Sequence, residues 1–210
     1  MVPPRAPSFL VQGSIELRQF DAVTLDAFGT LIELEDPVPR VQAAFGIDAD
    51  AATRGLDAEI AYYREHVLEG RDTASLADLR ARCAAVFAEA AGTKAGADAF
   101  QSCLVFVPLP GVVDALRRLR SRGLALAVVS NWDVGLHEHL SHLGLRFDAV
   151  VTSAESGIRK PDPRIFALVL ERLRVAPERA LHIGDDPIDE RAAKAAGLRF
   201  AYAPLADVLA

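Results

Sequence analysis

Continuously apolar runs alternate with amphipathic stretches along most of the chain. The runs do not alternate between polar and apolar positions, which is typical of parallel strands buried on both faces. They are Ala22–Leu25, Leu124–Val129, Ala149–Thr152, Leu181–Ile183 and Phe200–Ala203. Apolar residues recur at helical spacing in the stretches Val112–Arg122, Asp133–Leu143, Pro163–Arg174 and Ile188–Ala196. The alternation predicts an α/β fold, a doubly wound parallel sheet with helices on both faces.

The segment from residue 37 to residue 108 has a different pattern. It contains no strand-like run, and helical periodicity extends over Ala51–Leu68, Ala74–Ala91 and Ala95–Val105. Prolines mark both of its edges: Pro37, Pro39, Pro108 and Pro110. We therefore expect an all-helical cap domain at 37–108, inserted into a core domain made of 21–36 and 109–210. Residues 1–20 are interpreted as an N-terminal extension.

Polar side chains follow the predicted strands at the points where the strands end. Asp26 follows the first strand, Ser130 and Asn131 follow the second, and Lys160 and the acidic run 184–190 come later. A single Asp after a strand is often only a helix N-cap. Because the carboxyl ends of parallel strands meet at one edge, where ligands bind in such folds, four polar strand ends indicate a functional site.

Composition excludes several classes of protein. The 210 residues are 51% hydrophobic and carry a net charge of −6, without the basic excess of a nucleic-acid-binding protein. No apolar stretch approaches the roughly 20 residues that span a bilayer, and no signal-peptide pattern is present. Cys83 and Cys103 lack metal-ligand spacing and are interpreted as thiols. We expect a cytoplasmic protein that binds neither nucleic acid nor membrane.

Four motifs occur in a fixed order. They are LDAFGTL at Leu25–Leu31, VVSNWD at Val128–Asp133, GIRKPDPRIF at Gly157–Phe166 and HIGDDPIDE at His182–Glu190. Together they resemble the haloacid dehalogenase superfamily of hydrolases, in the branch with a helical cap between the first two motifs. The resemblance covers Asp21 to Leu198 and implies a Rossmann-like core.

The resemblance implies catalytic roles for two residues. Asp26 would be the nucleophile, and Lys160 would neutralise it and the charge on the group being transferred. Thr30 would also brace the loop, and Ser130 would donate its hydroxyl to the transferred group. The implied substrate-binding set is Gly29, Thr30, Ser130 and Asn131.

A magnesium ion is implied as well. Its ligands would be Asp26, the backbone carbonyl of Phe28 and Asp185, since Mg²⁺ prefers oxygen donors. The ion would screen two like charges, which repel by several kcal/mol when about 3–4 Å apart in a low-dielectric site. Asp186, Asp189 and Glu190 are further candidates, and the sequence does not choose among these three.

Phe28 departs from the phosphatase pattern. Phosphatases of the superfamily usually carry a second Asp there, which protonates the leaving group, and its loss removes roughly 10²–10⁴ of rate for a poor leaving group. Haloacid dehalogenases also carry an aromatic residue at this position and use no metal. However, the acid-rich fourth motif opposes a halide product. No clear halide-binding arginine follows the first motif either, since the nearest arginine, Arg40, lies in the linker.

Three functions therefore remain open. The favoured one is a Mg²⁺-dependent phosphatase acting on a small phosphorylated metabolite through an aspartyl-phosphate at Asp26. The first alternative is a metal-independent 2-haloacid dehalogenase, and the second is a catalytically weak, regulatory member that binds metal and phosphate. Oligomeric state stays open between monomer and homodimer. Candidates for specificity are Trp132 and the cap residues Glu59, Tyr62, Tyr63, Arg64 and His66, which either line the cleft or pack within the cap.

Overall fold

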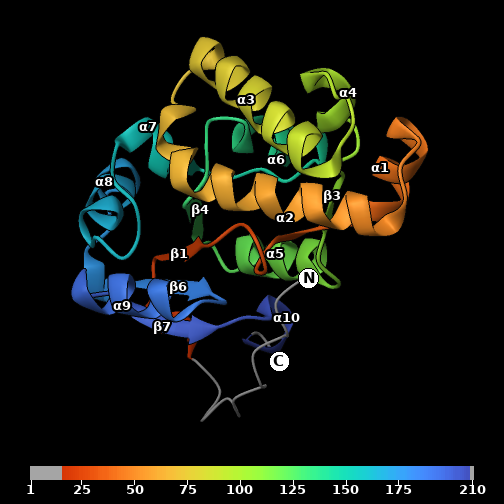
Figure 1. Cartoon of the computed structure of the whole chain (residues 1–210). Helices are drawn as coiled ribbons and strands as arrows, with labels where there is room; N and C mark the ends of the chain where they lie inside the picture. Colours follow the sequence, from red (N-terminus) through yellow and green to blue (C-terminus); the bar gives the residue numbers. More distant parts are fainter. Residues whose placement is uncertain (1–15, 209–210) are drawn as a thin grey trace.

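A five-stranded parallel sheet forms the centre of the protein in the computed structural model, which describes residues 16–208. The strand order is β5–β4–β1–β6–β7. Figure 1 labels β4, β1, β6 and β7, which follow one another in this order. The strands are β1 (Ala22–Leu25), β4 (Ala125–Ser130), β5 (Ala149–Thr152), β6 (Ala180–Gly184) and β7 (Arg199–Tyr202). The predicted parallel sheet is confirmed, with strand ends displaced by at most one residue.

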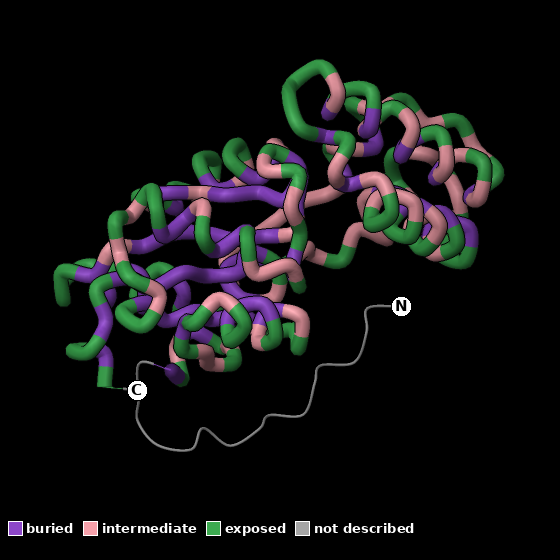
Figure 2. The backbone as a smooth tube through the Cα atoms, turned by 90° about the vertical axis from the view of Figure 1, so that its left-hand side faces the viewer, coloured by how far each residue is buried: buried purple, intermediate pink, exposed green. Residues whose placement is uncertain are grey.

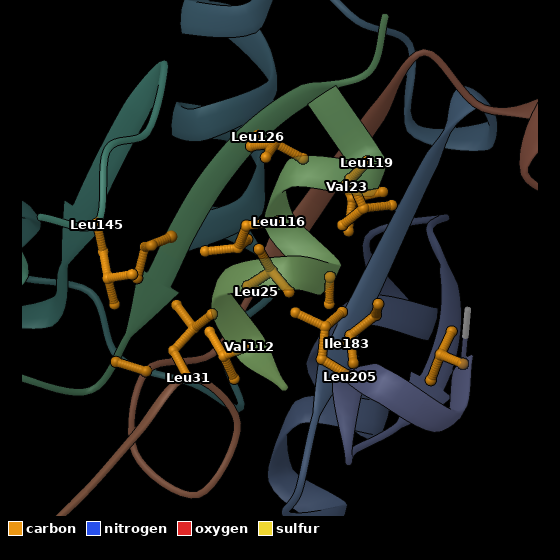
Figure 3. Close-up of a cluster of buried hydrophobic side chains, with 14 of the residues drawn as sticks. Val23, Leu25, Leu31, Val112, Leu116, Leu119, Leu126, Leu145, Ile183 and Leu205 are labelled. Atoms are coloured by element: carbon orange, nitrogen blue, oxygen red, sulfur yellow. The ribbon is translucent and has the colours of Figure 1, made fainter. Parts of the chain in front are cut away.

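Helices cover both faces of this sheet. One face packs against α5 (Val112–Ser121), α6 (Leu136–His142) and α10 (Leu205–Val208), and the other against α8 (Arg164–Leu173) and α9 (Pro187–Ala195). Alternate residues of β1 supply the two faces: Val23 and Leu25 belong to the first cluster and Ala22 to the second. Figure 3 shows the first cluster, in which Leu116 and Leu119 of α5 lie against the strands.

The inserted segment forms a helical cap with a hydrophobic core of its own. Its helices are α1 (Val38–Phe45), α2 (Ala49–His66), α3 (Thr73–Ala91) and α4 (Ala97–Gln101), with the short 3₁₀ helix η2 (Val67–Glu69). Phe87 and Phe100 are fully buried there, with ring centroids 4.5 Å apart. Gly55 lets α2 and α3 approach, since a Cβ atom on it would lie 2.6 Å from the Phe87 ring. Figure 2 shows the cap as a lobe beside the core.

The two connections to the cap pair with each other, so the predicted helical segment 37–108 ends in a short strand. Strand β2 (Ile32–Leu34) runs antiparallel to β3 (Phe106–Pro108), and Glu35 N donates to Val105 O at 3.0 Å. A strand of three residues is too short to show a hydrophobic periodicity in the sequence, so β2 and β3 were not predicted. Helix α1 was also not predicted, because its prolines look like linker residues, although Pro is compatible with the first turn of a helix.

The remaining described elements are small. They are the 3₁₀ helices η1 (Leu17–Gln19) and η3 (Pro177–Arg179) and the single-turn helix α7 (Ser153–Ser156). Leu17 and Phe20 pack into the core cluster, so the ordered core begins before the predicted boundary at Asp21; residues 1–15 of the predicted extension lie outside the described residues. Among the described residues, no helix is long and apolar enough to span a membrane.

Truncating the buried face of α5 should destabilise the protein much more than truncating its exposed face. Leu116 is 2% exposed, and Leu116→Ala should lower the free energy of unfolding by about 2–5 kcal/mol, because it removes packed methyl groups and leaves a cavity. Val113, on the same helix, is 47% exposed, and Val113→Ala should cost less than about 0.5 kcal/mol. Denaturant titrations of both variants test this, and equal costs would contradict the packing described.

Candidate active site

Asp26 lies at the carboxyl end of the central strand, where the chain order of the sheet reverses. Strand β1 pairs with β4 on one side and β6 on the other, and the backbone N–H of Asp26 donates to Ile183 O at 2.9 Å. The hydrogen bond extends the ladder by one residue and fixes the Asp26 backbone. Asp26 is 7% exposed, so its carboxylate lies in a largely dry environment at the switch point of the sheet.

The ammonium group of Lys160 joins the ends of three strands. Its Nζ lies 2.6 Å from Asp26 Oδ1, 2.5 Å from Asp189 Oδ1 and 2.9 Å from Val129 O. A lysine ammonium has three N–H donors, and all three therefore have an acceptor. Lys160 is 3% exposed. These contacts hold its charge against Asp26, in agreement with the predicted proximity of the two residues.

Asn131 holds the backbone of Lys160. Its Oδ1 accepts from Lys160 N at 2.8 Å, and its Nδ2 donates to Lys160 O at 3.0 Å. Both ends of the amide are thus engaged by one residue, which suits a positioning role. Ser130 is buried at the end of β4, paired in register with Thr152. The predicted roles of Ser130 and Asn131 in substrate binding stay predictions.

Asp189 contacts Lys160 directly, although the sequence marks it only as one of three further metal candidates. It occupies the first turn of α9, where acids are common because of the helix dipole. Its Oδ2 accepts from Asp186 N at 3.2 Å, which leaves Oδ1 to face Lys160. Gly184 makes room, since a Cβ atom on it would lie 2.5 Å from Asp189 Oδ2.

The other two acidic candidates have partners of their own. Asp186 caps α9 by accepting from Ile188 N at 2.7 Å. Glu190 binds Lys194 Nζ at 2.6 Å and accepts from the Tyr202 hydroxyl at 2.7 Å. Of these three acids, Asp189 is the one whose carboxylate lies beside those of Asp26 and Asp185; its role toward a metal stays a prediction.

Three carboxylates form a cluster that could hold a metal ion. One oxygen each from Asp26, Asp185 and Asp189 lies within 4.8 Å of the others. Asp185 is exposed and packs against Gly29, whose φ of +77° and missing side chain allow the approach: a Cβ atom there would overlap Asp185 Oδ2. Lys160 balances only part of this negative charge. Hard oxygen donors with excess negative charge fit Mg²⁺.

The pKa shifts follow from this crowding. Burial raises the pKa of Asp26, and the charge of Asp189 adds to the effect while Lys160 opposes it. Desolvation, with the charges of Asp26 and Asp189, raises the pKa of Asp185 to about 7. Burial would also raise the pKa of Asp189, but the adjacent Lys160 ammonium group outweighs it and holds this pKa well below its usual range. The site is thus short of positive charge at neutral pH.

Two buried polar atoms at the site have no hydrogen-bond partner among the described residues. One is Thr30 Oγ1, in the loop after Asp26. The other is Nε2 of His182, a fully buried residue whose Nδ1 lies 2.9 Å from Thr24 Oγ1. Nε2 faces Asp189 Oδ1 at 3.8 Å, which is longer than a hydrogen bond. Burial lowers the pKa of His182, so the ring adds no positive charge to the site.

Phe28 presents an exposed aromatic ring in the loop that follows Asp26. Phe28 is 45% exposed, and its ring centroid lies 6.3 Å from that of the buried Trp132. Trp132 in turn packs edge-on against Phe106 of β3, at 5.2 Å. The aromatic contacts thus run from the loop that follows Asp26 to β3, which connects the cap to the core. The predicted metal-binding role of the Phe28 carbonyl stays a prediction.

Most of the cap residues proposed for specificity pack within the cap or face solvent. The Tyr62 hydroxyl accepts from Arg82 Nη1 at 2.6 Å, and its ring stacks on His66 at 4.0 Å. Glu59 is 8% exposed, and burial raises its pKa to about 7. Arg64 is exposed. Tyr63 differs from these, because it reaches the core, where its hydroxyl donates to Asp133 Oδ2 at 2.7 Å.

A Rossmann-like sheet, a helical cap and an Asp–Lys–acid cluster at the strand ends define a hydrolase of the haloacid dehalogenase type. A family model of haloacid dehalogenase-like hydrolases matches residues 20–197. The chain belongs to this family, as its motifs predict.

Several relatives carry known names. The chain is 45% identical over 102 residues to haloacid dehalogenase-like hydrolase domain-containing protein 3 of Mus musculus, covering 47% of this chain and 41% of that protein. It is 47% identical over 88 residues to phosphoserine phosphatase of Thermus thermophilus, covering 40% of this chain and 35% of the relative. These alignments thus span between about a third and two fifths of the relatives' length.

The fold is also similar to a solved dehalogenase. The L-2-haloacid dehalogenase from Xanthobacter autotrophicus superimposes with a TM-score of 0.67 at 26% sequence identity, covering 87% of this chain and 77% of that one. This chain is therefore similar to one protein of each predicted enzyme type, a phosphatase and a dehalogenase.

Adding a methyl group at Gly29 should displace Asp185. Gly29→Ala and the control Gly144→Ala both place alanine at positive φ, +77° and +68°, and each should cost about 1–2 kcal/mol of stability. Only the first meets Asp185, since a Cβ atom on Gly144 has nothing within 4 Å. We expect Mg²⁺ titration calorimetry to show weakened binding for Gly29→Ala alone. Equal binding by both variants would contradict the assigned contact.

Proposed function

We propose that the protein is a Mg²⁺-dependent phosphatase that acts on a small phosphorylated metabolite through a covalent intermediate at Asp26. The observation that carries this proposal is the cluster of the Asp26, Asp185 and Asp189 carboxylates, two of which, Asp26 and Asp189, contact Lys160. Such a site needs a cation before it can accept an anionic phosphate, because like charges at this distance repel strongly where water is excluded. The likeness to phosphoserine phosphatase agrees with this proposal.

Asp26 would act as the nucleophile. Lys160 holds its Oδ1, so the other carboxylate oxygen is the one that attacks phosphorus. In that step the new O–P bond forms as the bond to the leaving group breaks, and the leaving group departs with the electron pair. Water then cleaves the aspartyl-phosphate and returns inorganic phosphate and the Asp26 carboxylate. Lys160 orients the nucleophile throughout and offsets the negative charge that gathers beside it.

The remaining residues of the site would bind the phosphate and the metal. Ser130 and the backbone N–H groups of the turn at Gly29 would contact the phosphate oxygens. Asp26, Asp185 and the Phe28 carbonyl would hold Mg²⁺, with Asp189 beside them. The ion would offset the repulsion between a carboxylate and a phosphate dianion.

A 2-haloacid dehalogenase is the second candidate, on two observations. The fold is similar to that of the Xanthobacter autotrophicus enzyme, and Phe28 stands where phosphatases carry their acid. A departing halide needs no proton, so Phe28 suits that reaction. The excess negative charge of the site opposes it, because halide and carboxylate substrate are both anions. A metal- and phosphate-binding member without turnover is the third candidate.

Assays of p-nitrophenyl phosphate and 2-chloropropionate separate the three candidates. We expect phosphate release with Mg²⁺, none with EDTA, and no halide release, and Asp26→Asn should abolish turnover because an amide is not a competent nucleophile. Metal-independent halide release would establish the dehalogenase instead. Mg²⁺ binding without either product would favour the binding protein.

The leaving group should decide the rate of the wild-type enzyme. Phe28 cannot donate a proton, so aryl and acyl phosphates should react faster than alkyl phosphates by a factor of about 10²–10⁴. Phe28→Asp should raise the kcat for an alkyl phosphate and leave acetyl phosphate hydrolysis nearly unchanged. Equal wild-type rates on all three substrates would mean that another residue supplies the proton.

Mg²⁺ affinity should depend on pH near neutrality. The pKa of Asp185 is raised to about 7, so its carboxyl group is protonated at lower pH and the cation must displace that proton. Binding should be strongest above pH 7 and weaken as pH falls, by up to about tenfold per pH unit. Titration calorimetry of Mg²⁺ binding between about pH 5.5 and pH 8.5 tests how steeply the affinity changes with pH. The control Asp185→Asn should bind weakly at every pH, and a flat wild-type profile would contradict the assignment.

A further inference from the structure

The cap contacts the core at a second place besides the β2–β3 ribbon. There the Tyr63 hydroxyl of α2 donates to Asp133 Oδ2 at 2.7 Å, and Val134 N donates to Gly70 O at 3.0 Å. Gly70 allows the close approach, because a Cβ atom on it would lie 2.8 Å from Asp133 Cβ. Both hydrogen bonds join the end of the α2–η2 segment to the loop that follows β4.

That loop carries residues of the active site. It begins at Ser130 and continues through Asn131, whose side chain holds the backbone N–H and C=O of Lys160. Lys160 in turn contacts Asp26. A continuous chain of hydrogen bonds and short backbone segments therefore leads from Tyr63 in the cap to the nucleophile in the core.

The two halves of the loop are held differently. The first half also contacts the core, since Trp132 O accepts from Ala154 N at 3.1 Å and from Ser153 Oγ at 3.2 Å. In the second half, Val134 N donates to the cap, and Gly135 N donates to Asp133 Oδ1 at 2.7 Å. The Asp133 carboxylate is only 5% exposed, so the Tyr63 hydroxyl is a donor that it cannot easily replace with water.

We propose that Tyr63 is a positioning residue for the reaction: by binding Asp133 it lets the cap fix the loop that carries Ser130 and Asn131, and so aligns Lys160 with Asp26. The cap would then complete the active site as well as cover it. The structural part of this inference stands on the contacts alone, and its consequence for phosphate binding rests on the proposed function.

The test compares Tyr63→Phe with Tyr62→Phe in the full chain. Each variant loses one tyrosine hydroxyl, and the two tyrosines are adjacent in α2. The Tyr63 hydroxyl binds Asp133 in the core, whereas the Tyr62 hydroxyl binds Arg82 within the cap. Amide hydrogen exchange is measured by NMR at Val134, which donates to Gly70, and at Lys160, which donates to Asn131. Tyr63→Phe should accelerate both amides at least tenfold and leave amides inside α3 unchanged. Tyr62→Phe should change neither.

Binding of inorganic phosphate in the presence of Mg²⁺ gives the functional readout. Tyr63→Phe should weaken it at least fivefold, and Tyr62→Phe by less than twofold. If the wild-type protein binds no phosphate, the proposed function fails while the exchange at Lys160 still tests the positioning. Asp133→Asn keeps an acceptor without the charge and should give an intermediate acceleration, which provides a second variant if Tyr63→Phe does not fold.

Two results would overturn the inference. One is an unchanged exchange rate at both Val134 and Lys160 in Tyr63→Phe. The other is faster exchange at Val134 with no change at Lys160, which would make the contact an anchor for the cap and nothing more.

Discussion

The arrangement of the site depends on the buried ammonium group of Lys160. It contacts Asp26 and Asp189 and the carbonyl of Val129, and so ties together residues that follow or flank β1, β4 and β6. Removing one partner of a buried charge pair leaves the other uncompensated, which is strongly destabilising. The chemistry of the site and the stability of the surrounding loops therefore depend on the same contacts.

The rest of the fold holds this group of charges in place. Parallel pairing brings the carboxyl ends of the three strands to one edge, and the hydrophobic clusters on both faces fix the sheet. Gly29 and Gly184 let the acidic side chains approach the backbone closely. The cap is attached through the β2–β3 ribbon and again through Tyr63, at the loop that also carries Asn131. The negative charge that Lys160 leaves unbalanced favours a cation-assisted reaction on an anionic substrate.

The sequence predicted those features that have a strong local signal. Buried parallel strands are continuously apolar, so the five strands were located almost to the residue, and the motifs indicated Asp26, Lys160 and Asp185. The sequence named further candidates, Asp189, Asn131 and Tyr63, but not the tertiary contacts that they make. Asp189 looks like any acid in the first turn of a helix, and only its orientation toward Lys160 distinguishes it. Asn131 binds Lys160, 29 residues away, and Tyr63 binds Asp133, 70 residues away. A periodic pattern along the chain does not indicate contacts between such distant residues.

The most direct test of the account is to locate the covalent phosphate. The protein would be mixed with acetyl phosphate and Mg²⁺, quenched in acid within one turnover, and its peptides mapped by mass spectrometry. The account predicts one added phosphoryl group on the peptide that contains Asp26, absent with EDTA and absent in Asp26→Asn. Phosphate release with the label on another residue, or with none on Asp26 at any time, would contradict the assignment of Asp26 as the nucleophile.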